Sequence, residues 1–334
     1  MWELVKTVIV AYLIMAFLLT CSLVIRMYWV NHKANAVKIG CKRIQELVEA
    51  GKWRQEPIYS MEAIKEKHSL GTVRLSYFEN PTGRRDKYVI ICPGGGYAHC
   101  VTEAEGFTIA AKVNELGYAA FVLEYRTGFN CSPYAPMEDL AMAILHIETN
   151  ADRFHVDPKD YAICGFSAGG NLAGIYGSHT YGFERYGTER PGALLLGYPW
   201  TNVNHWMQHA YWNVWIVLVG FWLTERGNLY MFGAQPSRKK RDSLCVQHWI
   251  TEDYPDTYMF AGSQDILVPA SLHTDIMAEA LEEHHVNYQY HKYFRVPHGI
   301  GIGMGTKAEG WLDEAIAFWQ NAVAAKDESA KTEA

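Results

Sequence analysis

The stretch YAICGFSAGGNLAG, residues 161–174, decides the fold of this chain. It starts as a short apolar run, passes through a serine with small neighbours, and continues with small and apolar residues typical of a helix. Within it, GFSAG at residues 165–169 fits the pattern G-x-S-x-G, in which a strained turn from strand to helix lifts a serine hydroxyl to the carboxyl edge of a sheet. We therefore predict a buried strand, a sharp turn and a helix, with Ser167 as a candidate nucleophile.

The rest of the chain alternates between strand and helix patterns. Short continuous apolar runs, typical of strands buried on both faces, are separated by segments of helical periodicity. This alternation predicts βαβ units around a mostly parallel sheet with helices on both faces. The predicted strands are residues 72–78, 87–92, 118–125, 160–166, 192–199, 257–262 and 286–294, and the predicted helices are residues 103–117, 135–151, 168–177, 270–284 and 308–325.

A nucleophilic serine requires a base, an acid that orients the base, and donors for the developing oxyanion. Asp265 lies just after the predicted strand 257–262, and His298 lies just after the predicted strand 286–294 in a glycine-rich loop. The order serine, aspartate, histidine along the chain is the order used by enzymes that carry this turn. We therefore predict Asp265 as the acid and His298 as the base.

Three consecutive glycines lie upstream of these residues, in CPGGGY at residues 92–97. Because glycine lacks a Cβ, backbone N–H groups in such a run can approach a ligand closely. We expect the amides of Gly95 and Gly96 to hold the oxyanion, together with the amide of Ala168 just after the serine. A flexible turn without a binding role is the alternative interpretation of the glycine run.

The sequence resembles the acetyl-esterase and acetylxylan-esterase-like group of the α/β hydrolases, relatives of the hormone-sensitive-lipase and prolyl-oligopeptidase clans. The resemblance covers roughly residues 70–325 and rests on four motifs in the family's order: PGGGY, GFSAGGNLA, GSQDILVP and PHGIGIGMGTKAEGWLDEAIAFW. It implies an α/β-hydrolase fold and a serine carboxylesterase that hydrolyses short-chain or small acyl esters through an acyl-enzyme. It also implies that Ser167 is the nucleophile, Asp265 the acid and His298 the base, and that the glycine run forms the oxyanion loop.

Other functions stay open on the sequence alone. A lipase or lysophospholipase would suit an apolar insert and an N-terminal anchor, but Pro93 stands where the lipase-type signature has a histidine before its glycines. A peptidase of the prolyl-oligopeptidase type shares the triad but usually carries a large additional domain. The non-enzyme alternative is a catalytically silent ligand-binding module, because hydrolase folds also host binding functions. Such modules usually lose a triad member, and this chain keeps all of them.

Residues 199–250 match the resemblance poorly and are rich in tryptophan. They fall between the sixth strand of the implied fold and the strand before Asp265, where esterases carry a cap, so we predict a cap insertion. Its core VWIVLVGFWL, residues 214–223, is apolar all round but too short to span a bilayer. Two interpretations are open: the run is an apolar lid that selects the acyl or aryl group of the substrate, or it is a cap helix that only packs on the body. The tryptophans are Trp200, Trp206, Trp212, Trp215, Trp222 and Trp249.

Three residues near the predicted site are candidates for substrate contact: Tyr97, His99 and Trp200. For His99, plain packing beside the oxyanion loop is the alternative. We interpret RKKR, residues 238–241, as a solvated loop. The alternative is that these basic residues contact anionic lipid headgroups.

The N-terminus has a different composition from the rest of the chain. Between Lys6 and Arg26 lie 19 residues without a charge, which as a helix span roughly 28 Å, about the thickness of a hydrocarbon core. We predict a membrane-anchoring helix. A cleaved signal peptide is an alternative, although the run exceeds the roughly 7–15 apolar residues of such peptides and no A-x-A site follows; a buried helix is another. Lysines and arginines are more numerous after the run, which predicts a body on the cytoplasmic side, with an extracytoplasmic body as the alternative.

The chain therefore divides into an anchor at 4–26, a helical connector at 27–56, a catalytic domain at 57–325 with the cap insert at 199–250, and a disordered tail at 326–334. A formal net charge of −6 argues against a nucleic-acid binder. The 7 cysteines are scattered without a CxxC pair, which favours a reducing compartment for the body. Without a Walker A, G-x-G-x-x-G or zinc-type pattern, we expect no cofactor and no metal, and we expect a small-molecule ester and a membrane as partners.

Overall fold

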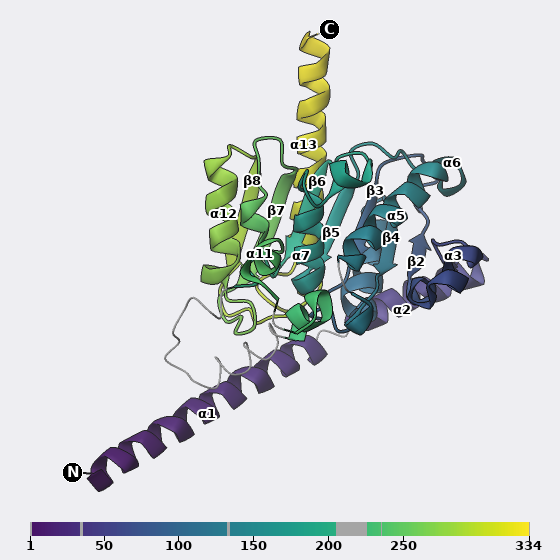
Figure 1. The fold of residues 1–334 in the computed structure, drawn as a ribbon. Coiled ribbons are helices and arrows are strands. Elements are labelled where there is room, and N and C mark those ends of the chain that lie inside the picture. The colour runs from purple at the N-terminus through teal and green to yellow at the C-terminus, as the bar shows by residue number, and fades with distance from the viewer. Residues whose placement is uncertain (1, 34–35, 132–133, 205–225, 235, 334) are drawn as a thin grey trace.

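A mostly parallel sheet forms the centre of the molecule. The computed structural model describes residues 2–33, 36–131, 134–204, 226–234 and 236–333. Its eight strands have the order β1-β2-β4-β3-β5-β6-β7-β8 (Figure 1). β2 runs antiparallel to β1 and β4, and all neighbours from β4 to β8 run parallel, which confirms the predicted sheet. The strands are β1 (Arg54–Glu56), β2 (Arg74–Phe78), β3 (Tyr88–Cys92), β4 (Ala119–Glu124), β5 (Ala162–Phe166), β6 (Ala193–Gly197), β7 (Asp256–Gly262) and β8 (Tyr288–Tyr293).

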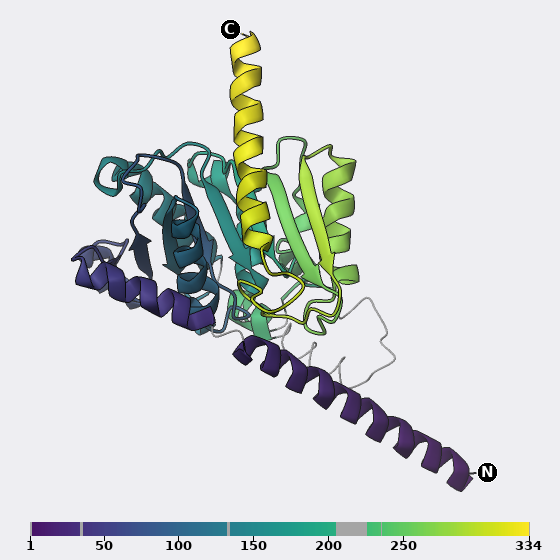
Figure 2. The ribbon, with the colours of Figure 1, turned by 180° about the vertical axis from the view of Figure 1, so that it is seen from behind.

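Helices cover both faces of this sheet (Figures 1 and 2). Successive side chains of a strand point to opposite faces, so Ile90 of β3 lies in one hydrophobic core and Val89 in the other. The first core contains residues of α5, α7 and α12, and the second contains residues of α2, α4 and α13. The described helices are α1 (Trp2–Lys33), α2 (Ala36–Glu49), α3 (Met61–Glu66), α4 (Thr108–Glu115), α5 (Ala135–Thr149), α6 (Ala151–Phe154), α7 (Ser167–Tyr176), α8 (Phe183–Tyr186), α11 (Arg238–Asp242), α12 (Thr274–Glu283) and α13 (Trp311–Glu333).

Two elements differ from the expected organisation. The connector predicted to be helical at 27–56 ends in β1, whose three residues pair with β2 at the edge of the sheet. So short a strand carries too few residues to show a period in the sequence. The tail predicted to be disordered at 326–334 instead continues α13 as far as Glu333. The alanines, lysines and glutamates of this segment are good helix formers, so the helix propagates into it.

The N-terminal helix α1 extends away from the body (Figures 1 and 2). Its segment Val5–Val30 is long and apolar enough to cross a membrane, judged by length and composition. The last turns of α1 contact the body: Nη2 of Arg26 donates to the carbonyl of Arg295 at 3.2 Å, and Val30 packs against the second core.

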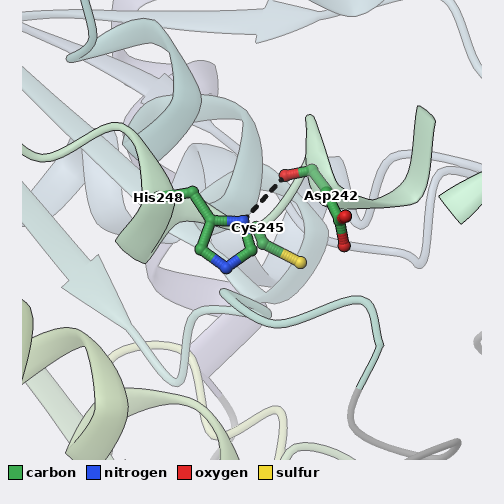
Figure 3. A group of neighbouring side chains, drawn as sticks. All are labelled: Asp242, Cys245 and His248. Atoms are coloured by element: carbon green, nitrogen blue, oxygen red, sulfur yellow. Dashed lines mark hydrogen bonds between the residues drawn. The ribbon is translucent and has the colours of Figure 1, made fainter. Parts of the chain in front are cut away.

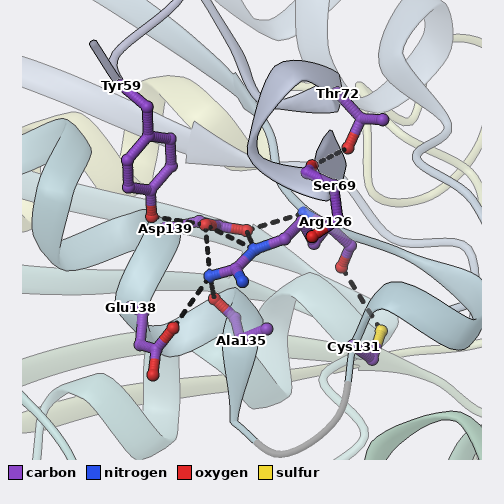
Figure 4. Close-up of polar contacts among 8 residues, drawn as sticks. All are labelled: Tyr59, Ser69, Thr72, Arg126, Cys131, Ala135, Glu138 and Asp139. Carbon is purple, nitrogen blue, oxygen red and sulfur yellow. Dashed lines mark hydrogen bonds and ion pairs between the residues drawn. The ribbon is translucent and has the colours of Figure 1, made fainter. Parts of the chain in front are cut away.

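A buried ion pair joins the end of β4 to α5 (Figure 4). Nε of Arg126 donates to Oδ1 of Asp139 at 2.9 Å, and the backbone N–H of Arg126 donates to Oδ2 at 2.8 Å. The hydroxyl of Tyr59 also donates to Oδ1 of Asp139, at 2.7 Å. Both charged side chains are fully buried. The Sγ of Cys131 donates to the carbonyls of Arg126 and Tyr97, so the pair also braces the segment after the glycine run.

Replacing Asp139 by Asn is expected to lower the free energy of unfolding by about 3–5 kcal/mol, because it removes the buried counter-charge of Arg126 and leaves this buried guanidinium with the half-exposed carboxylate of Glu138 at 2.9 Å. The measurement is chemical denaturation of the full chain in detergent. Arg85→Ala is the matched control: its partner Asp152 lies at the surface, and exposed pairs contribute about 0–1 kcal/mol. Equal losses in the two variants would contradict a structural role for the buried pair.

Candidate active site

The turn at Ser167 joins β5 to α7 in a space that leaves no room for side chains at two of its positions. β5 ends at Phe166, and Ser167 begins α7 with a positive φ of 50°, a conformation that non-glycine residues rarely adopt. A Cβ at position 165 would lie 2.5 Å from the carbonyl oxygen of Gly169, and a Cβ at position 169 would lie 2.1 Å from the carbonyl oxygen of Cys92. Only glycine fits at these two positions. The strand, turn and helix predicted from residues 161–174 are therefore confirmed.

The structure brings Ser167, Asp265 and His298 together at the carboxyl edge of the sheet. The hydroxyl of Ser167 lies 3.0 Å from Nε2 of His298, and Nδ1 of His298 lies 2.6 Å from Oδ2 of Asp265. Oδ1 of Asp265 accepts the backbone N–H groups of Leu267 at 2.9 Å and Val268 at 2.7 Å, which hold the carboxylate in place. Because the Nδ1–H donates to Asp265, Nε2 is the acceptor for the serine proton. This arrangement can activate the hydroxyl as a nucleophile.

The glycine loop lies against the same turn. Gly95 and Gly96 line a cavity that also reaches Ser167 and His298. Both have positive φ, 124° for Gly95 and 62° for Gly96. Ala168 lies in the first turn of α7, where backbone N–H groups have no acceptor within the helix. The positions of these residues suit the predicted oxyanion donors.

The cavity has a volume of about 290 Å³ and is lined by both polar and apolar residues. His99 and Trp200, both expected to contact the substrate, line it, as do the apolar side chains of Leu267 and Val268. Arg226 adds a cation to the wall. The sequence offered no pattern that would single out Arg226, because its place in the wall depends on how the insert returns to the body.

Tyr97 does not lie where we expected it. Its side chain is fully buried, and its hydroxyl donates to Oδ1 of Asn171 at 2.9 Å in the interior. Nδ2 of Asn171 in turn donates to the carbonyls of Trp200 and Leu244. The positive φ of Tyr97, 57°, turns its side chain inward and away from the cavity. Tyr97 thus fastens the glycine loop to α7 instead of facing a ligand.

Glu105 is a site residue that our sequence reasoning missed. It lies in the π-helical segment η2 (Thr102–Phe107), is 4% exposed, and lines the cavity. Its Oε2 accepts the N–H of Gly94 at 2.7 Å, and its Oε1 accepts the hydroxyl of Tyr198 at 2.7 Å. The ring of Tyr198 packs edge-on against His298, with 4.8 Å between the centroids. The sequence signal that could have identified Glu105 is an acidic residue placed among apolar residues in the predicted helix 103–117.

Burial of the site and the two carboxylates, Asp265 and Glu105, shift the pKa of His298 in opposite directions. Burial alone lowers the pKa of His298, but the charge and hydrogen bond of Asp265, with the charge of Glu105, outweigh it and raise the pKa above its ordinary value of 6.5. Burial raises the pKa of Glu105, and the hydrogen bond from Tyr198, the charge of His298 and the Gly94 amide offset part of that rise. The site therefore favours the imidazolium that forms after proton transfer.

A second group of side chains has the donor atoms of a metal site (Figure 3). The ligand atoms of Asp242, Cys245 and His248 all lie within 4.8 Å of one another. Nδ2 of Asn204 donates to Oδ1 of Asp242 at 2.6 Å and to Sγ of Cys245 at 3.5 Å. Burial raises the pKa of the Cys245 thiol to about 12, whereas a metal binds the thiolate. These contacts already account for the cluster, and we assign it no metal.

The tryptophan-rich middle of the predicted cap lies outside the described residues, which include 199–204, 226–234 and 236–250 of the insert. Trp206, Trp212, Trp215, Trp222 and the apolar run 214–223 all fall within residues 205–225, and the choice between a lid and a packed cap helix stays open. The described part of the insert shows residues 238–241 in the short exposed helix α11, whose N-cap is Ser237. Contact of this basic segment with lipid headgroups stays a prediction.

Comparisons with known proteins agree with the predicted resemblance. A family model described as BD-FAE matches residues 77–281. Endo-1,4-beta-xylanase B of Butyrivibrio fibrisolvens is 25% identical over 245 residues, which are 71% of this chain and 36% of that protein. Acetylxylan esterase of Xylanibacter ruminicola is 29% identical over 133 residues, 40% of this chain and 26% of that protein. The chain thus spans well under half the length of these curated relatives.

Solved structures resemble the fold over most of this chain. An acetyl ester-xyloside bifunctional hydrolase from Caldicellulosiruptor lactoaceticus superposes with a TM-score of 0.66 at 22% identity, over 80% of this chain and 96% of that one. An α/β hydrolase from a deep-sea metagenome superposes with a TM-score of 0.58 at 22% identity, over 81% and 98%. These matches confirm the α/β-hydrolase fold predicted from the sequence.

We expect the rate at which a fluorophosphonate labels Ser167 to fall as the pH is lowered through the pKa of His298, because only the neutral imidazole can accept the serine proton. The midpoint should lie above the ordinary value of 6.5, since Asp265 and Glu105 outweigh burial. Glu105→Gln removes one of these negative charges, so its midpoint should lie at lower pH.

In the Glu105→Gln variant the fluorophosphonate should also label Ser167 about tenfold or more slowly at the high-pH plateau. The reason is that Gly94 loses a charged acceptor and the glycine loop loosens. Glu124→Gln is the matched control: Glu124 is a partly buried acid whose hydrogen bonds go to Thr102 and Gln55, outside the cavity walls. Its midpoint should equal that of the unmodified protein. The same midpoint in Glu105→Gln would contradict the influence of Glu105 on His298.

Proposed function

The chain belongs to the BD-FAE family, and from that premise we propose that it is a serine carboxylesterase acting on esters of short or small acyl groups. The observation that carries the proposal is the hydrogen-bonded series from Ser167 through His298 to Asp265, at 3.0 Å and 2.6 Å, which opens on a cavity beside a glycine loop. The relatives named as an acetylxylan esterase and an acetyl ester-xyloside hydrolase support a small acyl group.

In this mechanism the hydroxyl of Ser167 attacks the ester carbonyl while Nε2 of His298 takes its proton. Asp265 keeps the Nδ1–H oriented and stabilises the imidazolium. The N–H groups of Gly95, Gly96 and Ala168 donate to the oxyanion of the tetrahedral intermediate. His298 then gives the proton to the departing alcohol, which leaves an acyl-serine.

The second half of the reaction repeats these steps with water. His298 takes a proton from a water molecule that attacks the acyl-serine, and the second tetrahedral intermediate collapses to the free acid and Ser167. The balance is one ester and one water consumed, and one carboxylic acid and one alcohol released. A cavity of about 290 Å³ supports a small acyl group, with the alcohol part extending toward the mouth.

A membrane-associated lipase or lysophospholipase is the second candidate. The observation in its favour is the apolar segment Val5–Val30, which would bring the body to a lipid surface. A series of p-nitrophenyl esters distinguishes the two candidates, because a short-chain esterase prefers acetate or butyrate and a lipase prefers long acyl chains.

Replacing Ser167 by Ala should abolish hydrolysis of p-nitrophenyl acetate, with a loss of about 10³-fold or more, because the nucleophile is removed. Cys100→Ala is the control for a thiol close to the glycine loop. Burial raises the pKa of Cys100 to about 12, so it is not a thiolate at neutral pH, and this variant should keep its activity. Full activity in Ser167→Ala would refute the serine esterase.

We further propose that α1 anchors the protein in a membrane with the body on the cytoplasmic side. The apolar segment Val5–Val30 and the larger number of lysines and arginines after it support this orientation. The full chain should stay with the membrane fraction after carbonate extraction, and added protease should leave the body intact in sealed cells. Mass spectrometry of the mature protein tests the alternative: loss of the first residues would indicate a cleaved signal peptide.

A further inference from the structure

We propose that the mouth of the cavity lies at the bilayer surface, so that the ester substrate is an amphiphile taken from the membrane. This inference rests on the proposed esterase function and on the proposed anchor. It concerns where the substrate comes from: the small acyl group enters the cavity, and the alcohol part remains among the lipids.

The anchor contacts the loop that carries His298. Arg26 ends the uncharged part of α1, and its Nη2 donates to the carbonyl of Arg295 at 3.2 Å. Arg295 precedes His298 by three residues. Tyr28 and Trp29 follow Arg26 on α1 and are 64% and 60% exposed. Aromatic residues next to a basic residue at the end of an apolar helix mark the level of the lipid–water interface. The loop before His298 therefore lies at that level.

The direction of the strands places the site at the edge of the sheet that the anchor meets. β4, β5 and β8 run parallel within the sheet, so their carboxyl ends lie at the same edge. Ser167 follows β5 and the loop before His298 follows β8. Figures 1 and 2 show the last turns of α1 against the edge from which the loop after β8 leaves. The site and the end of the anchor thus share one edge of the molecule.

Exposed apolar side chains lie on segments at this edge. Outside α1, six large apolar side chains of the described residues are exposed, and three of them lie on segments around the site: Phe129, Leu229 and Phe294. Phe129 is 81% exposed and Phe294 is 68% exposed. Phe129 is in the turn η3 (Gly128–Asn130) that follows β4 and contacts the ring of Tyr230, and Phe294 directly follows β8. Leu229 and Tyr230 come shortly after Arg226 of the cavity wall.

Single exposed apolar side chains are ordinary at protein surfaces. Phe129 and Phe294 follow β4 and β8 along the edge of the sheet where α1 meets the body, and Leu229 adjoins Tyr230, whose ring contacts Phe129. Inserting these three side chains among acyl chains or headgroups removes their apolar surface from water. The bilayer is the partner that this position favours, because the surface is continuous with the contact between α1 and Arg295.

The first test maps contact with lipid in the full chain reconstituted into phosphatidylcholine vesicles. The photocrosslinker p-benzoylphenylalanine replaces Phe294, and in a control protein it replaces Lys159, an exposed residue before β5 at the opposite edge. We expect lipid adducts at position 294 and at least about tenfold fewer at position 159. Absence of lipid adducts at 294, or adducts to a second copy of the chain, would overturn the proposal.

The second test compares two acetate esters, p-nitrophenyl acetate in solution and the acetate of a long-chain alcohol held in the vesicles. The double variant Phe129→Ser, Phe294→Ser should lose about tenfold or more of its rate on the vesicle-borne ester, because the apolar surface of both phenylalanines no longer leaves water when the protein meets the bilayer. Its rate on p-nitrophenyl acetate should change by less than about twofold. Equal losses on the two esters would overturn the proposal.

Controls separate this inference from the proposed function. The variant Met61→Ser removes an exposed apolar side chain on α3, and both rates should be unchanged. Fluorophosphonate labelling of Ser167 in the double variant shows that its site is folded. If the unmodified protein hydrolyses neither ester and is not labelled, the esterase proposal fails, while lipid adducts at position 294 would still support the membrane surface.

Discussion

The contact between the turn at Ser167 and the end of β3 is the constraint on which the site depends. A Cβ at position 169 would lie 2.1 Å from the carbonyl oxygen of Cys92, and one at position 94 would lie 2.9 Å from Cβ of Ser167. The first turn of α7 and the glycine loop are therefore held at van der Waals distance. In the proposed mechanism this closeness lets amides from two separate segments donate to a single oxygen atom, and Ser167 adopts a positive φ at the same turn.

Buried carboxylates organise the surroundings of that turn. Asp265 holds one nitrogen of His298, and Glu105 lies on the other side of Tyr198, where it also accepts the Gly94 amide. The cost of burying Glu105 appears in its raised pKa. Glu105 thus accepts a hydrogen bond from the glycine loop and another from Tyr198, whose ring packs against His298. Farther out, the pair of Arg126 and Asp139 braces the chain that follows the loop, through Cys131 and the carbonyl of Tyr97.

The position of α1 adds a second constraint, on the surroundings of the site. The proposed membrane anchor α1 contacts the body at Arg295, so the proposal places one edge of the sheet at the lipid surface. In a parallel sheet that edge carries the carboxyl ends of the strands, where α/β enzymes place their ligands. In this proposal, the direction of the strands and the position of the anchor together determine the side from which a substrate reaches the site.

Local patterns in the sequence determined much of the fold. The G-x-S-x-G turn, the apolar runs around it and the order of Ser167, Asp265 and His298 along the chain predicted the mostly parallel sheet and the residues that gather at its edge. These signals are local because a strand, a turn or a helix is encoded by neighbouring residues. The three-residue β1 and the helical end of the chain escaped the same reasoning, because the first depends on pairing with a distant strand and the second on continuation of α13.

The tertiary structure alone decided which side chains face the cavity. Tyr97 adjoins the glycine loop in sequence but turns inward to Asn171, whereas Glu105 lies in a helical segment and reaches Gly94, Tyr198 and the cavity. Arg226 joins the wall from an insert far along the chain. A contact of this kind depends on the path of the backbone between distant elements and on the direction of each side chain. Neither is encoded by neighbouring residues, so the sequence predicted the candidate reacting groups Ser167, Asp265 and His298, and the folded chain decided which side chains surround them.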